Sequence, residues 1–277
     1  MKKTSFKGWT IPGPEVPGGV NPSVDETCDA LCGHFKIFQA KEGHRFSTDY
    51  LLTAWFGAQG CPTASRILDL GSGMGTVAMI SAWKFPGAKV LSIEAQPMSV
   101  ALAHKSRIFN GLDARWEIRE GDFRDGKNFS ETEYFDLITG TPPYFPIGTG
   151  ILGDHPQKEA CRFELKGGIE DYCALVSKHL SPAGVFAVIF PMQQASQIER
   201  VSESAKRHEL VIFRERPIVL KEGEPPLLCL YLMMRASDLP EKMRSETWIE
   251  TPLVIRTRTG DINLEYSCAK LSIGFPP

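Results

Sequence analysis

Apolar and polar residues follow a regular order between residues 61 and 235. Short apolar runs, bounded by Gly, Pro or an acid, alternate there with longer stretches whose apolar residues recur every three or four positions. The first pattern is typical of buried strands and the second of helices. It predicts strands at 66–70, 89–93, 116–120, 134–138, 185–190, 210–213 and 227–235, and helices at 76–85, 97–110, 169–180 and 192–208.

This alternation predicts an α/β fold. Strands joined through a helix run parallel, and the helices then cover both faces of the sheet. The last two strands are separated only by the turn around 222–226, so we expect them to be antiparallel. The sheet should therefore be mostly parallel, with an antiparallel final strand.

The segments on either side of this core differ from it in composition. Residues 1–34 are rich in Pro and Gly, which predicts an extension without regular structure. A strand is expected at 35–39, a loop at 43–48, and then a helix that Ser47 or Thr48 caps. We divide the chain into the extension, 1–34, and one domain, 35–277. The domain consists of a first segment that covers the cofactor, 35–60, a sheet core, 61–235, and a C-terminal addition, 236–277. A small hairpin is expected around Gly260 in the C-terminal addition.

Bulk composition excludes several classes of protein. With 277 residues, 42% hydrophobic residues and a net charge of −2, the chain is typical of one globular domain with additions and shows no general attraction to nucleic acid. Seven cysteines without a Cys-x-x-Cys pair argue against a metal site, so no metal is expected. No apolar run is long enough to cross a bilayer and no signal-peptide core follows the first residues, so the expected location is the cytoplasm.

The most informative stretch is the turn Asp69-Leu70-Gly71-Ser72-Gly73-Met74-Gly75, between a predicted strand and a predicted helix. Glycines at alternate positions permit unusual backbone conformations and let a ligand approach the main chain. The N–H groups at the start of the helix then face that ligand. Dinucleotides and S-adenosylmethionine both bind at such turns, and a turn without a ligand is the plain alternative.

The residues around this turn favour S-adenosylmethionine. A dinucleotide fingerprint would place Gly or Ala at position 76, where this chain has Thr76. Asp69 would repel a pyrophosphate at short range, whereas the positively charged amino group and sulfur of S-adenosylmethionine would be attracted to it.

Two further carboxylates follow the next strands. Glu94 ends the second strand and is followed by Ala95, and its carboxylate can accept hydrogen bonds from ribose hydroxyls. Asp122 follows the third strand and precedes Phe123, and its carboxylate can accept a hydrogen bond from an adenine amino group. A single acid at a strand end is often only a surface charge. Three of them with the Gly turn predict a cofactor site made of Asp69, Gly71, Ser72, Gly73, Gly75, Glu94, Ala95, Asp122 and Phe123.

A second centre, Thr141-Pro142-Pro143-Tyr144, follows the fourth strand. Its position matters, because Pro-Pro also occurs at 225–226 and 276–277 without an implied site. The loop resembles the Asn-Pro-Pro-Tyr motif of S-adenosylmethionine-dependent methyltransferases that act on amino groups, and the core resembles their Rossmann-like seven-stranded sheet. This resemblance implies that the side chain at position 141 and the Pro142 carbonyl accept the amino hydrogens, and that Tyr144 stacks on the target.

Within that superfamily the chain is similar to bacterial tRNA adenine-N6-methyltransferases that modify a base beside the anticodon of a valine tRNA. The similarity covers about residues 35–265 and includes 38–39, 43–49 and 160–164. It implies an RNA partner, most simply a tRNA, and adds Gln39, Arg45 and Thr48 to the cofactor site. The chain departs from the motif at Thr141, where the family has Asn.

Two other functions stay open. The same amino-binding motif serves methylation of a glutamine amide in proteins, and Thr141 also allows a methyltransferase fold that only binds cofactor or RNA. The long connection at 146–167 is interpreted as a substrate lid. The oligomeric state is open, with a monomer favoured. Cations that could contact phosphates are Lys36, Lys41, Arg45, Arg162, Lys166, Arg256 and Arg258, although scattered surface charges are an equally good reading.

Overall fold

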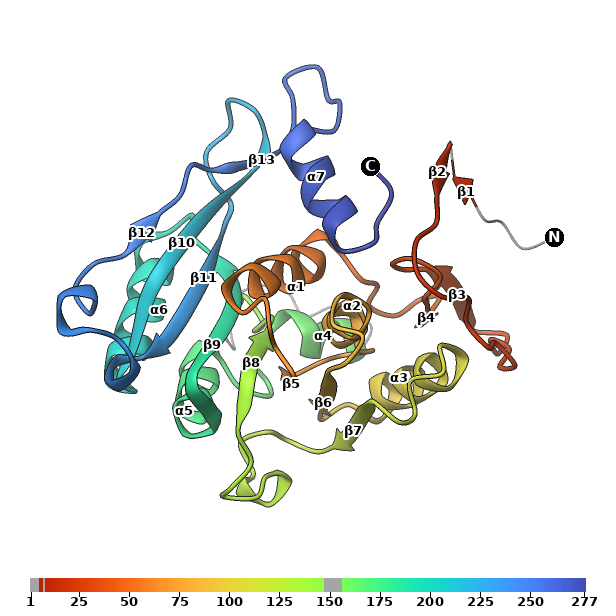
Figure 1. Cartoon of the computed structure of the whole chain (residues 1–277), viewed down its shortest axis with the longest axis horizontal. Coiled ribbons are helices and arrows are strands. Elements are labelled where there is room, and N and C mark those ends of the chain that lie inside the picture. The colour runs from red at the N-terminus through yellow and green to blue at the C-terminus, as the bar shows by residue number, and fades with distance from the viewer. Residues whose placement is uncertain (1–4, 7, 147–155) are drawn as a thin grey trace.

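The computed structural model describes residues 5–6, 8–146 and 156–277, and these form a mostly parallel sheet with helices on both faces (Figure 1). The long sheet has nine strands in the order β12-β10-β11-β9-β8-β5-β6-β7, with β13 also paired to β10. The strands are β5 (Arg66–Leu70), β6 (Lys89–Glu94), β7 (Trp116–Glu120), β8 (Phe135–Gly140), β9 (Leu180–Pro191), β10 (Leu210–Lys221), β11 (Leu228–Arg235), β12 (Trp248–Ile249) and β13 (Leu253–Arg256).

Strand directions agree with the prediction. The neighbours among β7, β6, β5, β8 and β9 are parallel, while β11 is antiparallel to both β9 and β10. The seven expected strands are thus confirmed, with the final one antiparallel and inserted between β9 and β10. The two short strands β12 and β13 extend the sheet beyond seven, both parallel to β10.

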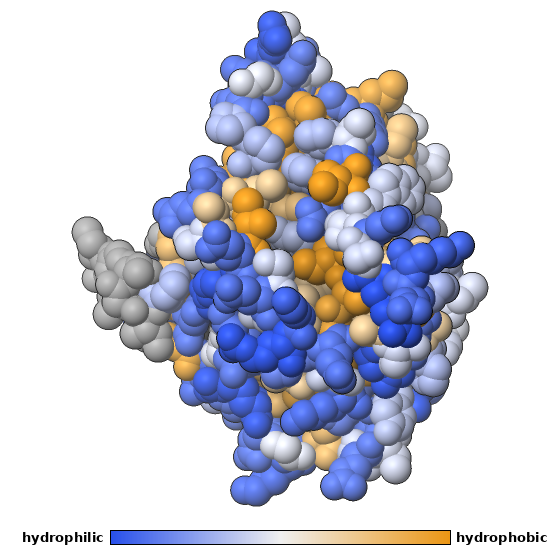
Figure 2. Space-filling model, turned by 90° about the vertical axis from the view of Figure 1, so that its left-hand side faces the viewer, coloured by the Kyte–Doolittle hydropathy of each residue, from blue (hydrophilic) through white to orange (hydrophobic). Residues whose placement is uncertain are grey.

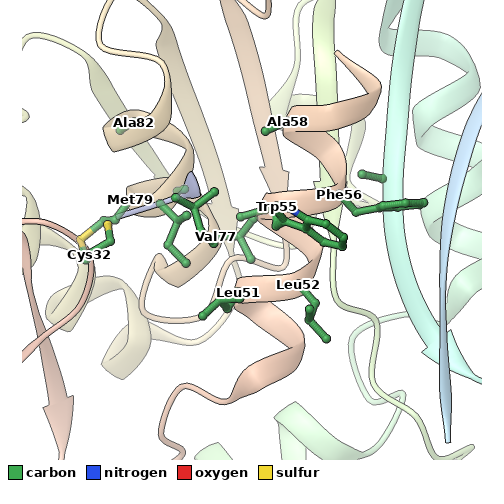
Figure 3. Packing of buried hydrophobic residues seen from close by; sticks show 14 of the residues in the cluster. Cys32, Leu51, Leu52, Trp55, Phe56, Ala58, Val77, Met79 and Ala82 are labelled. Atoms are coloured by element: carbon green, nitrogen blue, oxygen red, sulfur yellow. The ribbon is translucent and has the colours of Figure 1, made fainter. Parts of the chain in front are cut away.

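Two apolar layers enclose the sheet. One contains buried residues of α1, α2 and α3, and the other contains those of α5 and α6. Side chains of α1 and α2 meet in the first layer, where Phe56 is fully buried (Figure 3). Burial of a Phe side chain stabilises a fold by about 1.5–3 kcal/mol. The helices are α1 (Thr48–Gly60), α2 (Thr76–Lys84), α3 (Pro97–Phe109), α4 (Pro156–Arg162), α5 (Ile169–His179), α6 (Ala195–Arg207) and α7 (Leu264–Ser272).

The N-terminal extension is more regular than expected. Strand β3 (Glu26–Ala30) pairs antiparallel with β4 (Lys36–Ala40), and β1 (Ser5–Phe6) pairs with β2 (Trp9–Thr10). The prediction of an irregular segment up to residue 34 was wrong at β1, β2 and β3. The prolines of this segment stop at Pro22, so nothing prevents residues 26–30 from donating to a neighbouring strand.

Strand β10 extends to Lys221, well past the predicted end at residue 213. The sequence signal is lost there because Arg214, Glu215 and Arg216 interrupt the apolar run. Arg216 is nevertheless buried, since Glu250 and Glu265 of the C-terminal addition pair with its guanidinium. Charge neutralisation by distant residues thus allows a charged stretch inside the sheet.

Three other boundaries differ. Strand β9 begins at Leu180 and includes the predicted turn at 181–184, where Ala183 takes a positive φ of 58°. The expected hairpin around Gly260 is reduced to one antiparallel bridge between Arg256 and Ile262, because β13 pairs with β10 instead. The long connection at 146–167 contains the helix α4, and its residues 147–155 lie outside the described residues.

Strand β12 lies on the left in Figure 1, on the side that Figure 2 shows. Apolar residues are visible on that side between hydrophilic ones. Both residues of β12, Trp248 and Ile249, are largely exposed, and Arg214 lies 5.1 Å from the Trp248 ring centroid.

Candidate functional site

The carboxyl ends of β5, β6, β7 and β8 surround a hollow with a cavity volume of about 50 Å³ that opens to solvent. Ligands of open parallel sheets bind at this edge, because loops rather than helices follow the strands there. The hollow is lined by Tyr50, Gly71, Gly73, Ile93, Glu94, Ala95, Gln96, Gly121, Asp122, Phe123, Thr141, Pro143, Cys161, Lys166 and Tyr172.

The Gly turn forms the floor of the hollow. Gly71, Gly73 and Gly75 have φ values of 59°, 55° and 84°, a left-handed conformation that other residues adopt only with strain. Helix α2 starts directly after Gly75, so its free N–H groups begin at this turn. The predicted strand, turn and helix start are therefore confirmed.

Glu94 stands at the end of β6 and is 6% exposed. Its two carboxylate oxygens accept hydrogen bonds from the backbone N–H groups of Gly73 and Gln96, each at 2.8 Å. Burial raises the pKa of Glu94 above its ordinary value, and the two N–H donors counter part of that effect. Glu94 thus ties the Gly turn to the second strand end and faces the hollow.

Asp122 and Phe123 line the hollow beside Glu94. The Asp122 carboxylate pairs with Arg124 at 2.6 Å, and the Arg124 hydrogen bonds hold the pKa of Asp122 below its ordinary value. Phe123 is buried and packs edge-on against Tyr172, with ring centroids 4.7 Å apart. An acid and an aromatic ring therefore lie together at the third strand end, as the sequence predicts.

Asp69 lies beneath the turn and is not among the residues that line the hollow. Its oxygens accept hydrogen bonds from the Thr139 hydroxyl at 2.8 Å and the Ala78 N–H at 3.1 Å. Burial, reinforced by the charge of Glu94, raises the pKa of Asp69 to about 7 despite these two donors. The geometry gives Asp69 the role of holding β5, β8 and α2 together.

The residues that the resemblance added lie away from the hollow. The Gln39 amide bonds to Asp29 and to the Phe46 N–H, and Arg45 forms an ion pair with Asp29 at 2.8 Å. Thr48 begins α1 and is exposed. Of the predicted cofactor residues, the hollow is thus lined by Gly71, Gly73, Glu94, Ala95, Asp122 and Phe123, and not by Gln39, Arg45, Thr48, Ser72 or Gly75.

The loop after β8 borders the same hollow. Thr141 and Pro143 line it, and Pro142 is buried. Within the described residues the Thr141 hydroxyl has no hydrogen-bond partner. The Tyr144 hydroxyl donates to Asp49 at 2.8 Å, and its ring packs edge-on against Phe190.

Several lining residues were missed by sequence reasoning. Tyr172 and Tyr50 occupy helical positions that predict core packing, and Gln96 sits before the N-terminal Pro of a helix. Cys161 and Lys166 belong to the long connection, where no periodic signal exists. Only the residues at strand ends could be assigned to the site from sequence, because the order of strands and helices alone places them at one edge of the sheet.

The chemistry of the hollow fits S-adenosylmethionine. Gly71 and Gly73 leave the floor without side chains, Glu94 and Asp122 supply acceptors, and the buried Ser72 hydroxyl has no partner among the described residues. The described part of the chain contains no group of three or more His, Cys, Asp or Glu that could hold a metal ion.

Comparisons with known proteins agree with this chemistry. The family model "Methyltransferase small domain" matches residues 44–150. A tRNA1(Val) (adenine(37)-N6)-methyltransferase from Bacteroides fragilis is 27% identical over 215 residues, covering 76% of this chain and 87% of that protein. The protein of the same name from Porphyromonas gingivalis is 31% identical over 170 residues, covering 59% of this chain and 65% of its own.

The fold also has a match among solved structures. A predicted O-methyltransferase from Agrobacterium tumefaciens is similar with a TM-score of 0.59 and 18% identity, over 82% of this chain and 98% of that one. Among the helices that the structure describes, none is long and apolar enough to span a bilayer.

Proposed function

We propose that this chain, an S-adenosylmethionine-dependent methyltransferase, methylates the exocyclic amino group of an adenine in RNA, with a tRNA loop as the substrate. The observation that carries the proposal is the place of the Thr141-to-Tyr144 loop at the edge of the cofactor hollow. The names of the similar proteins from Bacteroides fragilis and Porphyromonas gingivalis support the same target.

The Thr141 loop suits an amino group on an aromatic ring. The lone pair of such an amino group is delocalised into the ring, which makes the nitrogen a poor nucleophile. Two acceptors that bind its hydrogens can turn the group and localise the lone pair. The Pro142 carbonyl and the unpartnered Thr141 hydroxyl are these acceptors in our proposal, and a hydroxyl can accept as an amide oxygen does.

The methyl transfer needs little further help from the protein. Bound S-adenosylmethionine supplies a methyl group on a positively charged sulfur, which leaves as a neutral thioether when the nitrogen–carbon bond forms. The chain's residues orient the nitrogen in line with the carbon–sulfur bond that breaks, and the proton that the amino group loses passes to solvent. In our proposal Tyr144 fixes the target ring, and its hydrogen bond to Asp49 fixes the loop against α1.

The first segment of the domain covers the cofactor in this proposal. Tyr50 of α1 lines the hollow, which supports a covering role for residues 35–60. An adenine must leave its stack to reach the hollow, which favours loop nucleotides over paired ones. Lys166 lines the hollow and can contact a nearby phosphate, whereas Arg45 and Arg258 are engaged in ion pairs.

Transfer of labelled methyl groups tests the proposal. The protein is incubated with labelled S-adenosylmethionine and either total RNA or total protein, and the digests are analysed for modified nucleosides and amino acids. We expect label in N6-methyladenosine. Label in N5-methylglutamine would contradict the proposal, and no transfer by protein that binds S-adenosylhomocysteine would instead indicate a binding module.

A further inference from the structure

Tyr172, the fourth residue of α5, is a buried residue whose hydroxyl faces the cofactor hollow. The residue is 2% exposed and lines the hollow, yet its hydroxyl has no hydrogen-bond partner within the described residues. Burial, together with the charges of Glu94 and Asp69, raises the pKa of Tyr172 well above its ordinary value. The hydroxyl therefore keeps its proton and is available as a donor.

The position of this side chain is defined by two glycines. A methyl group added at Gly71 would lie 2.4 Å from the Tyr172 hydroxyl oxygen, and one added at Gly140 would lie 2.7 Å from Cδ1 and Cε1 of the ring. Gly71 follows β5 and Gly140 ends β8. The hydroxyl thus lies directly over the Gly turn, on the β5 and β8 side of the hollow.

The acids near the hydroxyl accept their hydrogen bonds from other groups. Asp69 accepts from Thr139 and Ala78, and Glu94 accepts from the N–H groups of Gly73 and Gln96. A ligand that brings an acceptor to this point would therefore complete the hydrogen bonding of the Tyr172 hydroxyl.

The orientation of the cofactor follows from the strand ends. Carboxylates at the ends of the second and third strands suit the ribose and the adenine, so the nucleoside belongs over β6 and β7 near Glu94 and Asp122. The amino acid end then extends over β5 and β8. Its carboxylate is the only anionic group of S-adenosylmethionine, and an ionised acceptor forms the stronger hydrogen bonds.

We propose that the Tyr172 hydroxyl donates a hydrogen bond to the carboxylate of the cofactor's amino acid end, which makes Tyr172 a cofactor-binding residue. This inference rests on the cofactor of the proposed function and not on the RNA target. It gives α5 a part in ligand binding besides its packing in the core.

Binding by the full chain tests the inference without any turnover. Affinities of wild type and Tyr172→Phe are measured by calorimetry for S-adenosylhomocysteine and for decarboxylated S-adenosylmethionine. We expect Tyr172→Phe to weaken S-adenosylhomocysteine about tenfold to a hundredfold, because a hydrogen bond to a charged group contributes about 1.5–3 kcal/mol. Binding of the decarboxylated ligand should change less than about twofold, within the ordinary error of such comparisons.

Tyr231→Phe is the matched control, since Tyr231 is equally buried in the same apolar layer and does not line the hollow. It should leave both affinities unchanged. Equal losses for both ligands in Tyr172→Phe would show that the hydroxyl only supports the shape of the hollow, and unchanged or tighter binding would show that it makes no contact. Either result overturns the inference, whereas absence of N6-methyladenosine in the transfer assay would leave it standing.

Discussion

Substitution of Gly75 by Ala should destabilise the fold through a specific clash. A Cβ at position 75 would lie 2.3 Å from both Cη2 and Cζ2 of Trp116, whose side chain is 1% exposed. The indole cannot yield easily, because its Nε1 donates to the Ser92 hydroxyl at 2.8 Å. The chain must therefore move either the turn or a fully packed ring.

The magnitude follows from two separate costs. The φ of 84° at Gly75 places a new side chain in the left-handed region, which costs about 1–2 kcal/mol. Overpacking against the indole adds about 1–3 kcal/mol. Gly73 offers the matched control, because its φ of 55° imposes similar strain while a Cβ there meets nothing within 4 Å.

Urea denaturation followed by circular dichroism measures both variants. We expect Gly75→Ala to lower the free energy of unfolding by about 1–3 kcal/mol more than Gly73→Ala does, which is the overpacking cost alone. Gly73→Ala should instead weaken cofactor binding, since Gly73 lines the hollow. Equal destabilisation by the two variants would refute the reasoning, because it would mean that the indole accommodates the new methyl group.

Three further predictions concern Asp69, Thr141 and Tyr144. Asp69 has a pKa of about 7 in the fold against an ordinary 3.8, so the folded chain holds a proton that the unfolded chain loses. The free energy of unfolding of wild type, relative to that of Asp69→Asn, should fall as the pH rises from about 3.8 to about 7 and stay level above pH 7. Urea denaturation at several pH values measures this difference, and the absence of such a fall would contradict the pKa shift. Thr141→Ala should lower kcat about tenfold or more, while the Kd for S-adenosylhomocysteine should stay within about twofold of the wild-type value. Steady-state kinetics measures the first quantity and calorimetry the second. A variant with the wild-type kcat would show that Thr141 has no part in catalysis. Tyr144→Phe and Asp49→Ala should each lower the free energy of unfolding by about 1 kcal/mol through loss of the same hydrogen bond, and the double variant should fall short of the sum; full additivity would argue against the bond.

The sheet core could be predicted from the sequence because its evidence is local. Strands such as 66–70 are short apolar runs that end in turn residues, and topology then brings their carboxyl ends to one edge. Glu94, Asp122 and Thr141 meet at the hollow for this reason. Their positions needed no knowledge of side-chain packing.

What could not be predicted depends on contacts between distant residues. The charged part of β10 lies in the sheet because Glu250 and Glu265, which come later in the chain, pair with Arg214 and Arg216. Tyr172 has the helical spacing of a core residue, and its ring does pack in the core while its hydroxyl reaches the hollow. Periodicity reports which face of a helix is buried, but not what the end of a long side chain meets.

The central claim is that an adenine amino group in RNA receives the methyl group. Its most direct test uses S-adenosylmethionine with a deuterated methyl group, RNA from cells that lack this protein, and mass spectrometry of the digested nucleosides. The account predicts N6-methyladenosine that carries the full isotopic mass shift, present with wild type and strongly reduced with Thr141→Ala. Deuterated methyl groups on another nucleoside, or none in RNA while protein becomes labelled, would contradict it.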